Sequence, residues 1–313
     1  MKNDPLKNRE TETGDQAKAA VPKKRRLKYI AVLPSFITLI NGTMGFMSIV
    51  LASRGSVLGW TLPFIRRSYV TSFTVAGYMI LFAMLADMLD GRVARLTRTT
   101  SSFGGQLDSL CDALSFGAAP AFLMIKLMEI HLDHLRIGSQ NLSMLLGRAI
   151  FFSAILYVAC AIVRLARFNV ENEEDEAAHM SFSGIPTPAA AGVLVSLVIF
   201  HQQFLSRVVG ETSEFYRVFE IISLAVFPLI TLLTGVLMVS RISYPHLANQ
   251  LLRRKKTLPS LLAIFASGIL IIWNINLALI VGFCGFALYG IFRWLFGSLL
   301  KKRPPKNQDA VQK

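Results

Sequence analysis

Long apolar runs, separated by short polar and often basic segments, dominate the chain. Runs of spanning length are predicted at residues 29–52, 69–89, 105–128, 145–168, 188–204 and 218–240, the second continuing as helix to 95. Two shorter runs, 258–273 and 277–295, close the pattern. About 20 apolar residues in a helix cross the hydrocarbon core of a bilayer. The pattern therefore predicts an all-α polytopic membrane protein, with six core helices and about two extra helices near the C-terminus.

The same pattern divides the chain into four parts. Residues 1–27 are expected to be a disordered basic tail, and 28–245 the main transmembrane domain. Residues 246–298 are expected to be accessory transmembrane helices, and 299–313 a basic polar tail. The first apolar run is too long and begins too late for a cleaved signal peptide, so we expect it to be retained.

Composition supports a membrane protein and disfavours other classes. Hydrophobic residues make up 53% of the chain, charged residues 17%, and the formal net charge is +14. The basic residues cluster beside the apolar runs, without the aromatic-interleaved stripe of a nucleic-acid binder, so no nucleic-acid partner is expected. Three cysteines without CxxC spacing and five histidines without paired spacing disfavour a disulfide framework or a zinc site.

Basic residues in short loops predict the topology. If the N-terminus is cytoplasmic, so is the segment containing Arg92, Arg95 and Arg98, and so is the basic C-terminal tail. The pair Arg66 and Arg67 is the exception, since it falls on the opposite side. We therefore expect an integral protein of a bacterial-type cytoplasmic (inner) membrane, with the segment after the second span facing the cytoplasm.

Four aspartates lie in that segment, in the stretch DMLDGRVARLTRTTSSFGGQLDSLCD of residues 87–112. Asp87 and Asp90 are three apart, and Asp108 and Asp112 are four apart, so each pair shares one helix face. Two helices that each present such a pair can form an all-oxygen site for divalent cations. Acidic residues at the edge of a membrane span are costly and indicate function.

Small residues and an arginine accompany the acids. Gly91 and Ala94 lie on the acidic side of their helix, where lack of bulk lets a large group approach the backbone. Arg95 lies about one turn further, in position to hold a phosphate oxygen. Gly104 is expected to open the next helix or to let its first turn approach the site. The set suits a metal-bridged diphosphate; a structural ion-pair network is disfavoured because four acids face one nearby arginine.

The full pattern is Asp-x2-Asp-Gly-x2-Ala-Arg-x8-Gly-x3-Asp-x3-Asp, and it resembles the signature of the CDP-alcohol phosphotransferase family. The resemblance implies a six-helix membrane core that moves a phosphatidyl or similar group from a CDP-linked donor to an alcohol, releasing CMP. It implies two divalent ions, Mg²⁺ or Mn²⁺, held by Asp87, Asp90, Asp108 and Asp112, with Asp112 also the general base. It also implies that the CDP-binding residues include Gly91, Ala94, Arg95, Gly104, Thr38 and Asn41.

Other segments resemble the phosphatidylserine synthase branch of this family. They are ALSFGAAPA (113–121), RLARFN (164–169), FSGIPTPAAAG (182–192) and LMVSRISYP (237–245), together with Thr38, Asn41 and Gly45 in the first span. Ser35 departs from the wider family, which often has asparagine there. This resemblance implies CDP-diacylglycerol and L-serine as substrates, membrane lipid as surroundings, and a homodimer. Thr38 and Asn41 have an alternative interpretation as interhelical hydrogen-bonding residues.

Serine is a zwitterion, so its pocket needs a cation for the carboxylate. Arg164 and Arg167, with Asn169 just beyond, could bind the serine carboxylate or the donor phosphate; alternatively the arginines are topological anchors. Ser115 could line the acceptor site or be a helix-packing hydroxyl.

Three other functions compete with phosphatidyl transfer to serine. The nearest is another branch of the same family, with a different acceptor alcohol or an archaetidylserine-type lipid donor. An ion transporter with an acidic cluster would place its carboxylates near mid-span and break its helices. A lipid-binding scaffold would not need four acids.

Overall fold

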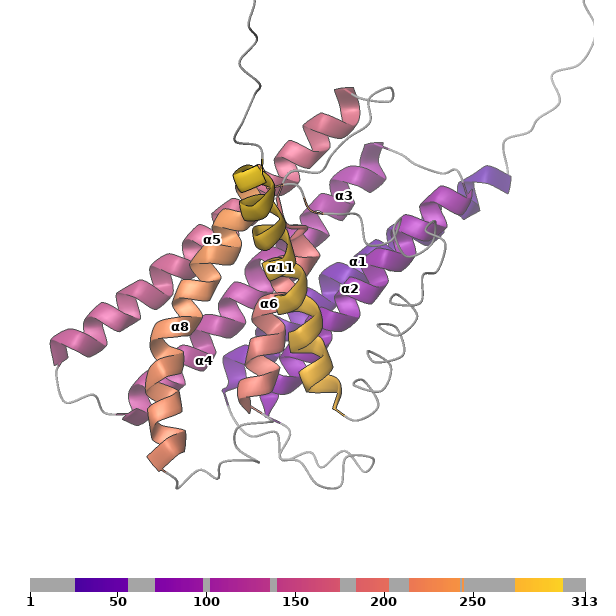
Figure 1. Cartoon of the computed structure of the whole chain (residues 1–313). Helices are drawn as coiled ribbons and strands as arrows, with labels where there is room; N and C mark the ends of the chain where they lie inside the picture. Colours follow the sequence, from indigo (N-terminus) through magenta and orange to yellow (C-terminus); the bar gives the residue numbers. More distant parts are fainter. Residues whose placement is uncertain are drawn as a thin grey trace, which may run out of the picture.

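The computed structural model describes residues 26–55, 71–97, 102–135, 140–174, 184–202, 214–242, 244 and 274–300. Its elements are helices that pack side by side (Figure 1). They are α1 (Arg26–Arg54), α2 (Ser72–Thr97), α3 (Ser102–Asp112), the π-helix η1 (Ala113–Ala118), α4 (Ala119–Leu135), α5 (Gln140–Glu174), α6 (Thr187–Phe200), α8 (Glu214–Val239) and α11 (Ile275–Leu300).

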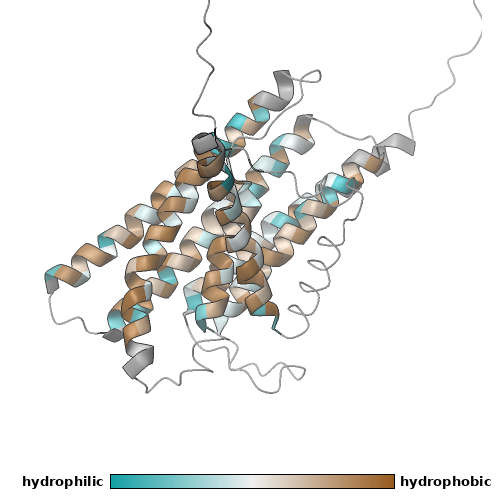
Figure 2. Cartoon of the chain, in the orientation of Figure 1, coloured by the Kyte–Doolittle hydropathy of each residue, from teal (hydrophilic) through white to brown (hydrophobic). Residues whose placement is uncertain are grey.

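Six helical segments among the described residues are long and apolar enough to cross a membrane, which confirms the predicted all-α polytopic class. They are Pro34–Arg54, Ser72–Ala94, Phe103–Asp133, Asn141–Val170, Val218–Val239 and Ile275–Phe296. Hydrophobic residues cover most of their length (Figure 2). The predicted run at 258–273, the first 25 residues and the tail after 300 lie outside the described residues.

The third span was predicted at residues 105–128. In the structure it is one continuous helical rod made of three segments. α3 begins at Ser102, two residues before Gly104, and continues without a break through η1 into α4. π-helical turns inside α-helices are rare and occur mostly at functional sites. This π-helix starts directly after Asp112, so a wider turn adjoins the last of the four acids.

α1 meets this rod along a stripe of small and polar residues. The buried positions Thr38, Asn41, Gly42, Gly45, Ser48 and Ala52 recur at helical spacing on one face. A Cβ atom on Gly42 would lie 2.8 Å from Cys111 Sγ, and one on Gly45 would lie 2.6 Å from Ser115 Cα. α1 therefore approaches α3 and η1 almost backbone to backbone, a packing that glycine permits in membranes.

Buried polar contacts join the other helices to this unit. The Tyr157 hydroxyl of α5 donates to the Phe116 carbonyl of η1 at 2.9 Å. The Tyr78 hydroxyl of α2 donates to Asn276 Oδ1, next to the start of α11, at 2.9 Å. The Tyr244 hydroxyl donates to the Ala287 carbonyl at 3.2 Å. The last two contacts link α11 to α2 and to Tyr244, and the domain boundary at residue 245 stays a prediction.

Replacing Gly45 with valine should destabilise the fold, because the new Cβ would overlap Ser115 at the closest approach of α1 and η1. Overpacking of this kind typically costs about 1–3 kcal/mol. The matched control is Gly282→Val in α11, since a Cβ there meets no atom within 4 Å. We expect a lower melting temperature in detergent for Gly45→Val only. Equal melting temperatures for both variants would contradict the close approach.

Candidate functional site

Three of the four predicted acids converge from two helices. Asp87 and Asp90 lie on α2 and Asp108 lies on α3, and each offers a carboxylate oxygen within 4.8 Å of the other two. α1 packs against both α2 and α3, which fixes the two helices relative to each other. The predicted pairing of the acids across neighbouring helices is therefore present for this trio.

The fourth acid lies beside the trio and is held by α1. The Asn41 side-chain amide donates a hydrogen bond from Nδ2 to Asp112 Oδ1 at 2.9 Å. Asp112 is 8% exposed, and its carboxylate is close enough to Asp87, Asp90 and Asp108 to repel them electrostatically. All four acids thus belong to one concentration of negative charge within the bundle.

The chemistry of this cluster fits divalent cations. Asp90 Oδ2 and Asp108 Oδ1 are buried and have no hydrogen-bond partner among the described residues. Carboxylates that repel one another and have buried oxygens without donors are costly, and a bound cation removes both costs. An all-oxygen donor set suits hard cations such as Mg²⁺ and Mn²⁺. The residues present therefore fit the metal ions that the sequence predicts.

The predicted nucleotide-binding residues come from α1, α2 and α3. Among the residues that the structure describes, a Cβ on Gly91 would meet no atom within 4 Å, so these residues leave space beside Asp90. Thr38 of α1 and the Gly91 backbone amide both contact the Asp90 carboxylate. Ala94 continues α2 and Gly104 lies in the first turn of α3. The backbone of Arg95 belongs to α2, and its side chain lies outside the described part of the chain.

Asn41 and Ser115 make the interhelical hydrogen bonds that were one of their two interpretations. Besides the bond from Asn41 to Asp112, Ser115 Oγ donates to the Asn41 carbonyl at 2.9 Å. Both residues are fully buried. Contact of either side chain with a substrate stays a prediction.

The acceptor-side residues lie at the C-terminal end of α5. Arg164 Nη1 donates to Thr187 Oγ1, at the start of α6, at 2.6 Å. Ser109 Oγ of α3 donates to Asn169 Oδ1 at 3.0 Å, so the last turns of α5 lie beside the acids. Arg167 is exposed on the same part of α5. Ser109 and Thr187 were missed from sequence, although Thr187 lies in the segment FSGIPTPAAAG and follows a proline, as helix starts often do.

A second polar cluster lies elsewhere in the bundle, and histidine spacing in the sequence could not reveal it. His131 Nδ1 lies 3.0 Å from Glu220 Oε1, and the His131 and His201 ring centroids are 4.5 Å apart. His131 follows Asp112 by 19 residues along the rod, which corresponds to about 28 Å. This cluster is therefore remote from the acids.

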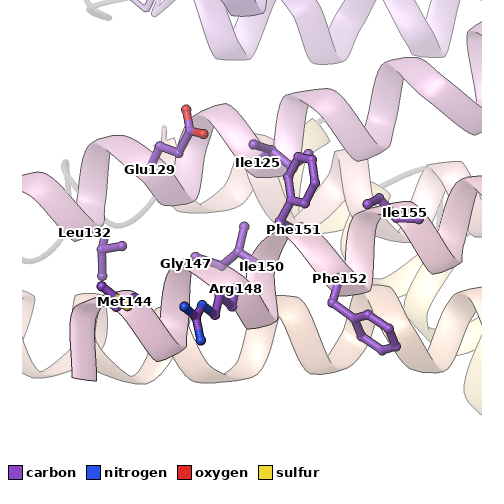
Figure 3. Close-up of a pocket in the computed structure, with 10 residues that line it drawn as sticks. All are labelled: Ile125, Glu129, Leu132, Met144, Gly147, Arg148, Ile150, Phe151, Phe152 and Ile155. Carbon is purple, nitrogen blue, oxygen red and sulfur yellow. The ribbon is translucent and has the colours of Figure 1, made fainter. Parts of the chain in front are cut away.

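A groove of about 650 Å³ lies between α4 and α5 (Figure 3). Its lining is mostly apolar, with Glu129 and Arg148 as its charged members, and Glu129 pairs with Lys126 at 2.8 Å. None of the predicted site residues lines it. The groove therefore does not coincide with the predicted site.

Removing one carboxylate of the trio should stabilise the metal-free protein while abolishing its response to metal. In Asp108→Asn, repulsion with Asp87 and Asp90 falls. We expect Mn²⁺ to raise the melting temperature of the wild type in EDTA-treated samples, and to leave that of Asp108→Asn unchanged. Asp133→Asn, at an exposed position of α4, serves as control and should respond like the wild type. Metal stabilisation of Asp108→Asn equal to that of the wild type would exclude Asp108 as a ligand.

Comparison with known proteins agrees with this geometry. The CDP-diacylglycerol–serine O-phosphatidyltransferase of Helicobacter pylori is 32% identical over 265 residues, covering 85% of this chain and 92% of that protein. The protein of the same name from Methanocaldococcus jannaschii is 29% identical over 225 residues, covering 72% and 79%. The archaetidylserine synthase of Methanothermobacter thermautotrophicus is 30% identical over 225 residues, covering 71% and 73%.

The match to a family extends over most of the described helices. Residues 31–292 match the CDP-alcohol phosphatidyltransferase family, from α1 into α11. Members of this family use divalent metal ions, and the acidic cluster of this chain suits such ions. The chain belongs to the CDP-alcohol phosphatidyltransferase family.

Proposed function

We propose that this chain is a phosphatidylserine synthase, which transfers the phosphatidyl group of CDP-diacylglycerol to the hydroxyl of L-serine and releases CMP. The observation that carries the proposal is the convergence of Asp87, Asp90 and Asp108 within 4.8 Å, with Asp112 beside them. Relatives named for the same reaction at 29–32% identity, over most of this chain, support the choice of donor and acceptor.

The four acids would hold two divalent ions, Mg²⁺ or Mn²⁺, as the family resemblance implies. When bound, such ions neutralise a diphosphate and polarise its phosphorus. Among the described residues, Gly91 leaves space next to Asp90, where the diphosphate can approach the α2 backbone. Ala94, Gly104 and Thr38 would border the same space, and Arg95 is placed by the sequence to hold a phosphate oxygen.

Asp112 would act as the general base. A serine hydroxyl near its normal pKa is a poor nucleophile, so a carboxylate within reach must take its proton. The serine oxygen then forms the new bond to phosphorus, while the bond from phosphorus to the CMP oxygen breaks. The proton passes from serine to Asp112, and CMP leaves as an anion.

The serine carboxylate would be held by the cationic end of α5. Arg164 is oriented by Thr187, and Arg167 and Asn169 follow within the next two turns. Ser109 bonds Asn169 from α3, between Asp108 and Asp112, so these groups lie beside the base. Serine would enter from the cytoplasm and the donor lipid from the inner membrane, as the distribution of basic residues predicts.

A second candidate function is supported by one comparison. The archaetidylserine synthase of Methanothermobacter thermautotrophicus is 30% identical to this chain, so a CDP-linked archaeal-type lipid is the alternative donor. The ion-transporter alternative expected carboxylates near mid-span and broken helices, whereas α2 runs unbroken past Asp87 and Asp90, which lie towards its C-terminal end.

Purified protein should incorporate serine into lipid when given CDP-diacylglycerol and Mn²⁺. The test supplies radiolabelled serine, glycerol phosphate, inositol phosphate and choline in competition, and repeats the assay with a CDP-linked archaeal-type donor. We expect labelled phosphatidylserine and stoichiometric CMP. Incorporation of another alcohol in place of serine would assign the chain to a different branch, and activity with the archaeal-type donor alone would select the second candidate.

Asp112→Asn should abolish turnover while largely sparing CDP-lipid binding, because asparagine keeps the shape of the side chain but accepts no proton. Turnover is measured as CMP release, and binding as protection of the melting temperature by CDP-diacylglycerol with Mn²⁺. Asp133→Asn is the control, since that residue is exposed at the far end of α4. A wild-type rate in Asp112→Asn would remove this residue from the chemistry.

A further inference from the structure

The side chain of Asn41 in α1 contacts the proposed base, whereas the sequence predicted a role in nucleotide binding. Its side-chain amide donates from Nδ2 to Asp112 Oδ1 at 2.9 Å. The other polar atom of this amide, Oδ1, is buried and has no hydrogen-bond partner among the described residues. The amide orientation follows from chemistry, because a flipped amide would place its oxygen against a carboxylate oxygen. The hydrogen bond of this side chain is therefore with Asp112, the proposed base.

The backbone around Asn41 is held in place by contacts with α3 and η1. Ser115, one turn beyond Asp112, donates from Oγ to the Asn41 carbonyl at 2.9 Å. Gly42 and Gly45 lie so close to Cys111 and Ser115 that no side chain fits between the helices. Asn41 is 0% exposed, so the amide has little freedom to leave Asp112. The asparagine and the carboxylate consequently have a fixed relative position.

We infer that Asn41 is a positioning residue for Asp112: its amide bonds Oδ1 and fixes the direction in which the carboxylate faces. This inference rests on the proposed function, since it assigns a partner to the proposed base. Asn41 takes no part in bond making: the serine oxygen bonds to phosphorus, the CMP oxygen leaves, and the proton goes to Asp112.

A neutral amide suits this task. A lysine or arginine in its place would add a positive charge that competes with cations for the same carboxylate. An amide orients the carboxylate with a hydrogen bond and leaves its net charge unchanged. Residues that orient a ligand or base in this way typically contribute about 10- to 100-fold to activity.

The first test compares Asn41→Ala and Asn41→Leu with Thr43→Ala. Thr43 is an exposed residue of the same helix whose hydroxyl bonds its own Ile40 carbonyl at 2.9 Å, so this control should keep the wild-type rate. We expect kcat to fall about 10- to 100-fold in both Asn41 variants. The KM for CDP-diacylglycerol should stay near the wild-type value. A raised KM with unchanged kcat would overturn the inference in favour of direct donor contact.

A double-mutant cycle with Asp112→Glu distinguishes the positioning of Asp112 from a purely structural role of Asn41. The longer glutamate carboxylate no longer matches the Asn41 amide, so adding Asn41→Ala should cost little further activity if Asn41 acts through residue 112. An equal fold-loss in both backgrounds would show that Asn41 acts independently, and would overturn the inference.

Two outcomes keep this inference separate from the proposed function. If Asp112→Asn is inactive while Asn41→Ala and Asn41→Leu keep the wild-type kcat, the positioning role fails and the base survives. If Asp112→Asn is fully active, the proposed base itself fails. If neither Asn41 variant accumulates as folded protein, a structure of the wild type with bound CDP tests the positioning role. An Asn41 amide on Asp112 supports the role, and one on the nucleotide excludes it.

Discussion

Mutual repulsion among buried and half-buried carboxylates is the constraint on which the rest of this structure depends. Asp87, Asp90 and Asp108 lie within 4.8 Å of one another, and Asp112 adds a fourth negative charge next to them. Without cations, such a group opposes folding, because like charges at short range in a medium of low dielectric repel strongly. The surrounding helices must therefore hold these side chains together until an ion neutralises them, and the packing of α1 provides that restraint.

α1 carries out this role through small residues. Its stripe of Thr38, Asn41, Gly42 and Gly45 lets it approach α3 and η1 closely while it also packs against α2. Close approach makes short hydrogen bonds available to Asp112 and to the Asn41 carbonyl. Packing and polar satisfaction thus coincide at the same four positions, which is why a polar stripe is tolerated inside a membrane span.

Much of this arrangement could be predicted from sequence because it depends on local periodicity. Apolar length located the spans, and spacings of three and four placed Asp87 with Asp90 and Asp108 with Asp112 on common faces. Contacts between segments distant in the chain could not be predicted, since nothing local links Asn41 to Asp112 or His131 to Glu220. The π-helix after Asp112 was also missed, because its residues fit a regular apolar helix equally well.

The bond between Arg164 and Thr187 has a consequence for how the cationic end of α5 is held. Thr187 is the first residue of α6, and α6 packs against α2, α4, α8 and α11. The position of the Arg164 guanidinium is therefore linked to the packing of four further helices. A substitution inside that packing, far along the chain from the arginine, would move this cation, so the placement of a single charge is a property of the whole bundle.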